Sequence, residues 1–140
     1  MDKRKKVCFV SDNNTCRSII AEVSLRHLAR QYFEVQSFGL KADRVHYLVA
    51  SVLQSRDMNP NYSFSKVFEV VENQKFDIIV LMHPSLKDKL PKIDYDHELL
   101  VWDFEAIALS EDDEDRHRKA LESLCDAIMK QIKTFVEKYK

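Results

Sequence analysis

The fold of this 140-residue chain follows from one stretch near its start, residues 7–18, which reads Val7-Cys8-Phe9-Val10-Ser11-Asp12-Asn13-Asn14-Thr15-Cys16-Arg17-Ser18. Its first four residues are apolar and partly β-branched, which is typical of a buried strand. The next five are polar, and from Ser18 apolar residues recur at helical spacing as far as Tyr32. The stretch therefore predicts a strand, a polar loop and an α-helix, in that order.

The rest of the chain repeats this alternation of strand and helix. The nearly continuous apolar run Phe76–Met82 predicts a strand buried on both faces. Further strands are predicted at 34–38 and 99–102, and helices at 45–56, at 65–72 with Ser65 as cap, and from the acidic start Ser110–Asp115 to residue 139. This order predicts a single α/β domain, residues 1–140, with a four-stranded parallel sheet, helices on both faces and right-handed crossovers.

Composition and charge exclude several classes of protein. Hydrophobic residues make up 45% and charged residues 32%, which excludes a disordered chain or a fibrous repeat. The net charge of -1 provides no positive field for nucleic acid or an anionic membrane. No apolar run approaches the roughly 20 residues of a membrane span, and the basic start lacks the apolar stretch of a signal peptide. We therefore expect a cytoplasmic protein with neither nucleic-acid nor membrane partners.

Two residue counts are informative. Three cysteines, an odd number without metal-ligand spacing, suit a reducing compartment and predict no disulfide framework, metal site or cofactor. The chain has a single glycine, Gly39, where average usage would give about ten. Positions that need a positive φ must therefore be filled by another residue type, and asparagine is the next candidate.

The loop after the first strand has the ingredients of an anion site. Ligands of parallel sheets bind at the carboxyl ends of strands, and a helix that starts there directs unpaired N–H groups at the ligand. Asn13 and Asn14 can take left-handed conformations that turn successive N–H groups inward. Arg17 offers a planar fork for two oxygens of a tetrahedral anion, while Ser18 can cap the helix or donate to residue 11. Asp12 is compatible with an anion only if its side chain points outward. The alternative is a plain polar loop with an exposed arginine.

The order of residues in this loop resembles the low-molecular-weight protein tyrosine phosphatases and the thiol-dependent arsenate reductases that share their fold. The family loop reads Cys-x-Gly-Asn-x-Cys-Arg-Ser and continues into Ala-Glu. This chain matches it in register at Asn14, Cys16, Arg17, Ser18, Ala21 and Glu22. Ser37-Phe38-Gly39 is similar to the family's Ser-Ala-Gly, and residues 80–91 and Trp102-x-Phe104 resemble reductase segments. The resemblance spans nearly the whole chain and implies a phosphotyrosine-phosphatase-I-like fold.

The same resemblance assigns roles in the loop. It implies that the anion is held by residues 12–17, namely Asp12, Asn13, Asn14, Thr15, Cys16 and Arg17, with Ser18 beside the reacting residue. Position 11, where the family has its nucleophilic cysteine, is Ser11. A serine hydroxyl without an adjacent base is a very poor nucleophile. Cys8 and Cys16 do not occupy the attacking position, and Cys125 lies on the apolar stripe of the last helix as a buried hydrophobe.

Further departures concern the other catalytic groups of the family. The general-acid Asp, which precedes Pro, aligns with Ala106-Ile107, so Glu105 or Asp103 is the only stand-in, against the plainer interpretation of both as solvated loop carboxylates. The paired redox cysteines of the reductases align with His83 and Leu90, which removes the thiol relay. In the reductase branch, Asn14, Glu22 and Ser37 would also resemble a potassium site.

Three functions are compatible with these residues. In the first, the loop captures a phosphate-like oxyanion or a phosphorylated protein without turning it over. In the second, the chain is a protein tyrosine phosphatase whose natural residue 11 is cysteine, with Ser11 as an inactive variant. In the third, it is an interaction protein with a relic loop, which an Asp12 carboxylate folded onto Arg17 would favour. Nothing in the sequence sets an oligomeric state.

Overall fold

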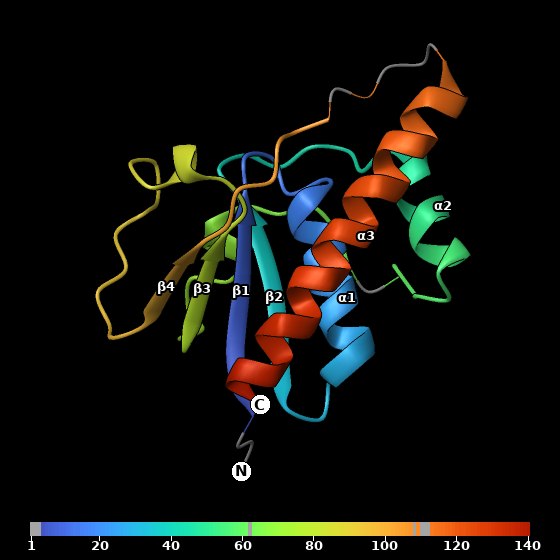
Figure 1. Ribbon diagram of the computed structural model, residues 1–140. Helices are drawn as coiled ribbons and strands as arrows, with labels where there is room; N and C mark the ends of the chain where they lie inside the picture. The colour runs from blue at the N-terminus through green and yellow to red at the C-terminus, as the bar shows by residue number, and fades with distance from the viewer. Residues whose placement is uncertain (1–3, 62, 108, 110–112) are drawn as a thin grey trace.

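The computed structural model describes residues 4–61, 63–107, 109 and 113–140. The predicted alternation of strands and helices is present in it (Figure 1). The elements are β1 Lys5–Ser11, α1 Arg17–Ala29, β2 Phe33–Gly39, α2 Tyr47–Ser55, β3 Ile78–Leu81, β4 Glu98–Val101 and α3 Glu114–Tyr139, with 3-10 helices η1 Phe68–Val70 and η2 Pro84–Leu86.

All four strands run parallel, in the order β2-β1-β3-β4, which confirms the predicted sheet. Ser11 pairs with Gly39 of β2, and Val10 pairs with Leu81 of β3. The carboxyl ends of β1, β2 and β3 therefore lie at the same edge of the sheet. The loops that follow these strands meet at that edge, which is where a parallel sheet binds its ligands.

Alternation along β1 divides the core in two. Val7 and Phe9 face a large cluster formed with α1, α2 and α3, in which the Phe9 ring lies 5.7 Å from Trp102 and 6.4 Å from Phe135. Cys8 and Val10 face a smaller cluster that includes residues near η1 and η2. Helical segments thus cover both faces, as predicted, but unequally. The three α-helices lie on one side of the sheet in Figure 1.

The predicted helix from Ser65 to residue 72 is wrong. Ser65 caps no helix, because its hydroxyl donates to the Asn13 carbonyl (2.7 Å) and accepts from the Asp43 N–H (2.9 Å). Val67 instead forms a parallel bridge with Gly39, and only Phe68–Val70 turns as a 3-10 helix. The segment is therefore extended where it supports the loop after β1.

The final helix begins at Glu114, and its cap is Asp113, whose side chain accepts from the Arg116 N–H (3.2 Å). Ser110 of the predicted acidic start lies outside the described residues. None of the helices described is both long and apolar enough to cross a bilayer.

Candidate oxyanion-binding site

The loop between β1 and α1 carries a row of backbone donors at the start of a helix. α1 starts at Arg17 with no side-chain cap, so the first-turn N–H groups have no capping oxygen. Within the described part of the chain, no protein oxygen accepts from the N–H groups of Asp12, Asn13, Thr15, Cys16 or Arg17. Such a row of donors at a helix start favours a bound anion.

Asn14 is the structural centre of the loop. It is fully buried and left-handed, with φ of 53°, and its side-chain amide donates to Ser18 Oγ (2.7 Å) and Ser37 Oγ (2.9 Å). Its Oδ1 accepts the Lys66 N–H (3.0 Å), so every polar atom of the side chain is bonded. Asn13, for which a left-handed conformation was also accessible, has a negative φ. Its side chain instead accepts from Thr15 Oγ1 (2.8 Å).

Ser11 lies at the end of β1 with 1% exposure. Its Oγ is 2.6 Å from Ser18 Oγ and accepts from the Asn14 N–H (3.1 Å). Ser18 therefore contacts residue 11, one of its two predicted roles, and does not cap α1. Among the described residues, no imidazole or carboxylate is hydrogen-bonded to the Ser11 hydroxyl. The hydroxyl can donate or accept a hydrogen bond but has no base to activate it.

Arg17 is held by two segments. Its Nη1 donates to the Phe104 carbonyl (2.8 Å), and its Nη2 lies 3.4 Å from Asp12 Oδ2. Only 5% of Arg17 is exposed. The Asp12 carboxylate thus turns toward the Arg17 guanidinium, which is the arrangement expected for a relic loop. The Asp12 side chain nevertheless stays 48% exposed.

A buried carboxylate, Glu22, lies beneath the loop. It accepts from Ser37 Oγ (2.6 Å), from Arg26 Nη2 (3.0 Å) and from the Ser63 hydroxyl, and Lys66 Nζ lies 3.7 Å from it. Asn14, Ser37 and Glu22, which the resemblance linked to potassium, are thus in contact. The buried ammonium of Lys66 supplies a positive charge there, and it also donates to the Phe64 carbonyl (3.3 Å).

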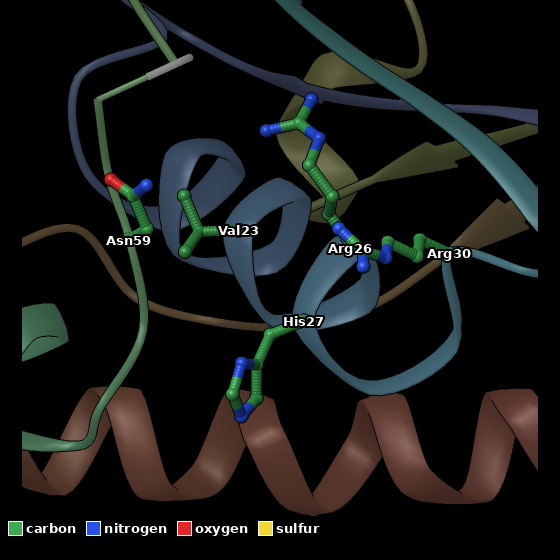
Figure 2. Close-up of a pocket in the computed structure, with 5 residues that line it drawn as sticks. All are labelled: Val23, Arg26, His27, Arg30 and Asn59. Carbon is green, nitrogen blue, oxygen red and sulfur yellow. The ribbon is translucent and has the colours of Figure 1, made fainter.

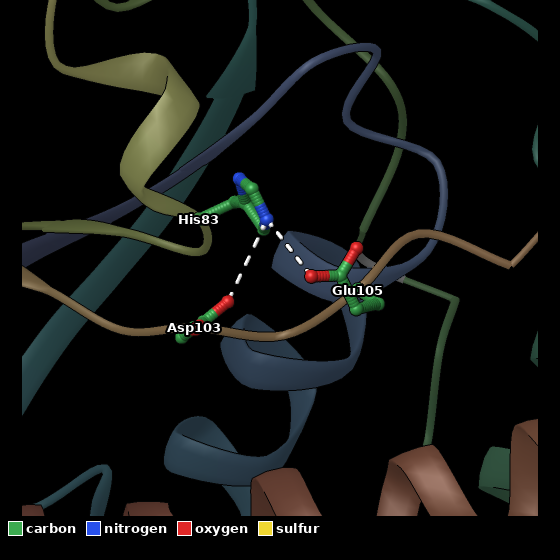
Figure 3. Close-up of side chains that lie close together, drawn as sticks. All are labelled: His83, Asp103 and Glu105. Atoms are coloured by element: carbon green, nitrogen blue, oxygen red, sulfur yellow. Dashed lines mark hydrogen bonds and ion pairs between the residues drawn. The ribbon is translucent and has the colours of Figure 1, made fainter.

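His83, Asp103 and Glu105 form a second polar cluster beside the loop (Figure 3). His83 Nε2 lies 3.2 Å from Glu105 Oε1 and 3.5 Å from Asp103 Oδ1. His83 Nδ1 accepts the Ser85 N–H (3.1 Å), so the neutral ring carries its proton on Nε2 and donates to the carboxylates. A metal at Nε2 would need the other tautomer. Glu105, the candidate acid, is 84% exposed and bonded to His83 rather than to the loop.

The three cysteines are free thiols. Burial raises the pKa of Cys16 to about 12 and that of Cys125 to about 11, and it raises the pKa of Cys8 well above its usual value. A thiol that stays protonated is neither a nucleophile nor a metal ligand. The prediction that Cys125 is a buried hydrophobe is confirmed, since it packs in the larger core cluster.

A separate hollow of about 340 Å³ lies beside α1, lined by Val23, Arg26, His27, Arg30 and Asn59. Figure 2 shows that the side chains of its three basic residues point in different directions. The guanidinium of Arg26 is already used by Glu22, by Ser63 and by the Val35 carbonyl (3.2 Å). The hollow therefore does not present converging donors to an anion.

Sequence reasoning missed three contributors to the site. Lys66 and Ser65 come from the extended segment before η1, which was predicted to be helical. Phe104 contributes only its carbonyl, which any residue would supply. The one sequence signal for any of these three residues was Trp102-x-Phe104, whose resemblance to a reductase segment pointed to the region of Phe104.

The class of protein is an α/β domain with a polar loop between the carboxyl end of β1 and the start of a helix. Comparison with known proteins identifies the family within this class. Residues 6–139 match the family described as low molecular weight phosphotyrosine protein phosphatase. The chain belongs to this family.

Three similar proteins illustrate the range of the family. An arsenate reductase of Halalkalibacterium halodurans is 25% identical over 134 residues, which cover 96% of each chain. The thioredoxin-dependent arsenate reductase of Corynebacterium glutamicum has a TM-score of 0.75 at 24% identity; the match covers 97% of this chain and 62% of that one. An arsenate reductase in the phosphate binding state has a TM-score of 0.72 at 19% identity, with 97% and 99% covered. The two structural likenesses show the fold.

Proposed function

We infer that this chain binds a phosphate-like oxyanion in the loop of residues 12–17 and does not hydrolyse phosphate esters. The observation that carries the inference is the row of loop N–H groups that find no acceptor among the described residues, next to a buried Arg17 whose Nη1 is fixed by the Phe104 carbonyl. Fixed donors and a preorganised guanidinium are what a tetrahedral anion requires. The arsenate reductase solved in its phosphate binding state supports this chemistry for the fold.

The absence of turnover is proposed from the groups around the anion position. Among the described residues, the Ser11 hydroxyl is hydrogen-bonded only to Ser18 and to the Asn14 N–H, so no base increases its nucleophilicity. Glu105, the candidate general acid, is hydrogen-bonded to His83 and not directed at the loop. Buried Cys8 and Cys16 have raised pKa values and remain thiols at neutral pH. No described side chain therefore combines the position and the protonation state of the family nucleophile.

The Asp12–Arg17 ion pair is the observation that favours a relic loop instead. This ion pair is a weak argument against anion binding, because the Asp12 side chain is 48% exposed. A pair whose carboxylate is half exposed is screened by water and contributes on the order of 1 kcal/mol, so displacing the carboxylate should weaken anion binding by about fivefold. The pair reduces the affinity of the loop without closing it.

Calorimetric titration with inorganic phosphate tests the proposed function. We expect saturable binding at millimolar phosphate or below, and a loss of roughly 100-fold in Arg17→Ala, since charged hydrogen bonds of about 3 kcal/mol disappear. The charge-matched control is Arg30→Ala, at the exposed end of α1, which should bind phosphate like the parent chain. Equal heats for the parent and Arg17→Ala would show that the loop holds no anion.

A phosphatase with cysteine at position 11 is the second candidate. The observation in its favour is the Ser18 hydroxyl, which lies 2.6 Å from the Ser11 hydroxyl and could equally donate to a thiolate. Ser11→Cys should then cleave an aryl phosphate between pH 5 and 8. If the folded variant and its parent are both inert, this candidate fails.

The remaining assignments are proposals of the same kind. We expect a phosphorylated protein to be one source of the oxyanion, and the absence of cofactor and metal to hold. A cytoplasmic location stays a prediction, supported by the three free thiols.

A further inference from the structure

Asp12 is the only acidic side chain of the anion loop, and its position is fixed from two sides. Its carbonyl accepts the Lys41 N–H (3.1 Å), which anchors the backbone next to β2. Its Oδ2 lies 3.4 Å from Arg17 Nη2. A carboxylate at this distance from the guanidinium adjoins any oxyanion that the same guanidinium binds.

The chemistry of such a neighbour depends on whether the ligand carries a proton. A carboxylate is an acceptor only, so beside a fully ionised anion it has nothing to accept and adds repulsion. Beside an oxyanion with a hydroxyl it accepts a short charge-assisted hydrogen bond. Inorganic phosphate and arsenate keep a hydroxyl at neutral pH, whereas sulfate has none, and phosphate monoesters, with a second pKa of about 6, are mostly dianions.

The other carboxylates near the loop are already bonded. Glu22 accepts from Ser37, Arg26 and Ser63 and faces Lys66 beneath the loop. The carboxylates of Asp103 and Glu105 lie 3.5 Å and 3.2 Å from His83 Nε2 (Figure 3). Among the described residues, Asp12 is therefore the carboxylate that contacts the guanidinium of Arg17.

We propose that Asp12 makes the loop selective for tetrahedral oxyanions that carry a proton, such as inorganic phosphate and arsenate, against fully ionised ones such as sulfate. This rests on the proposed function, because it concerns the same site. Sites built around one hydrogen bond to a ligand hydroxyl reject analogues that lack it by about 10⁴-fold. Half-exposed Asp12 is screened by water, so the preference is expected to be at least about tenfold.

The test is calorimetric titration of the parent chain, Asp12→Asn and Asp43→Asn with inorganic phosphate and with sulfate at pH 7. The parent should bind phosphate at least about tenfold more tightly than sulfate. In Asp12→Asn the two affinities should approach within about threefold, mainly because sulfate gains. Asp43→Asn removes an equal charge from an exposed neighbour of the loop and should keep the parent ratio. At pH 5 phenyl phosphate is mostly singly protonated, because the second pKa of a phosphate monoester is about 6, so phenyl phosphate against phenyl sulfate at that pH repeats the comparison on the parent with esters.

The outcomes separate the two proposals. Equal binding of phosphate and sulfate by the parent overturns the selectivity, as does an unchanged ratio in Asp12→Asn. A uniform gain for both anions in that variant also overturns it, since Asp12 would then only compete for Arg17. If no variant binds any anion, the proposed function itself fails.

Discussion

Gly39 is the residue at which a single added carbon should disturb the site most. A Cβ on Gly39 would lie 2.7 Å from the Asn13 carbonyl carbon, 2.7 Å from the Asn14 nitrogen and 2.7 Å from the Lys41 carbonyl oxygen. All three are backbone atoms, which cannot rotate away. The constraint is one of space, because Gly39 lies in β2 and has no positive φ.

The sign of the Gly39→Ala effect follows from two opposing terms. Restricting the unfolded chain would stabilise the variant by about 0.4–1 kcal/mol if the methyl group fitted. Overpacking against fixed atoms costs about 1–3 kcal/mol, and three simultaneous contacts place this case at the upper end. We therefore expect a net loss of about 2 kcal/mol, or roughly 1 M in the urea midpoint for a chain of this size.

The assay combines urea unfolding with phosphate titration. Because the displaced atoms belong to the anion loop, Gly39→Ala should lose at least about tenfold in phosphate affinity as well as stability. A variant as stable as its parent, with unchanged phosphate binding, would refute the reasoning. It would mean that the loop backbone shifts at no cost.

Two further predictions concern buried groups. Glu22→Gln keeps the shape of the side chain but removes the negative partner of Lys66, whose side chain is only 3% exposed. The free energy of unfolding in urea titration should therefore fall by about 3 kcal/mol. Adding Lys66→Met should recover part of this loss, and strictly additive effects of the two substitutions would contradict the pairing. Burial raises the pKa of the Cys16 thiol from 9.0 to about 12. As the pH rises above 9, this thiol ionises in the unfolded chain before it ionises in the folded one, so the free energy of unfolding should decline from pH 9 toward pH 12. Cys16→Ala should flatten that decline, and a parent chain that gains stability over the same interval would contradict the assignment.

The sheet could be predicted because its signals are local. The apolar run that contains β3, the β-branched residues of β1 and the alternation in β2 are each readable within a few residues. The need for a left-handed asparagine could likewise be anticipated from the shortage of glycine. Which of Asn13 and Asn14 takes that conformation could not, because it depends on partners 4 and 23 residues away from Asn14.

The parts of the site that escaped prediction are long-range. Lys66 looks like any surface lysine until its burial against Glu22 is known, and it lies 52 residues from the asparagine it contacts. Ser65 has the residue type of a helix cap, but the Asn13 carbonyl takes its hydroxyl. The sequence left open whether the Asp12 carboxylate points outward or turns toward Arg17. Tertiary contacts outweighed local preference in each case.

The hydrogen bonds that shape the loop involve Asn14, Ser18, Ser37 and Lys66, and residue 11 contributes one small polar atom at the edge of that framework. Exchanging oxygen for sulfur there would leave nearly all of the framework in place. The attacking atom and the architecture are consequently separable at residue 11: the exchange would change the nucleophile while the domain unfolds at nearly the same denaturant concentration.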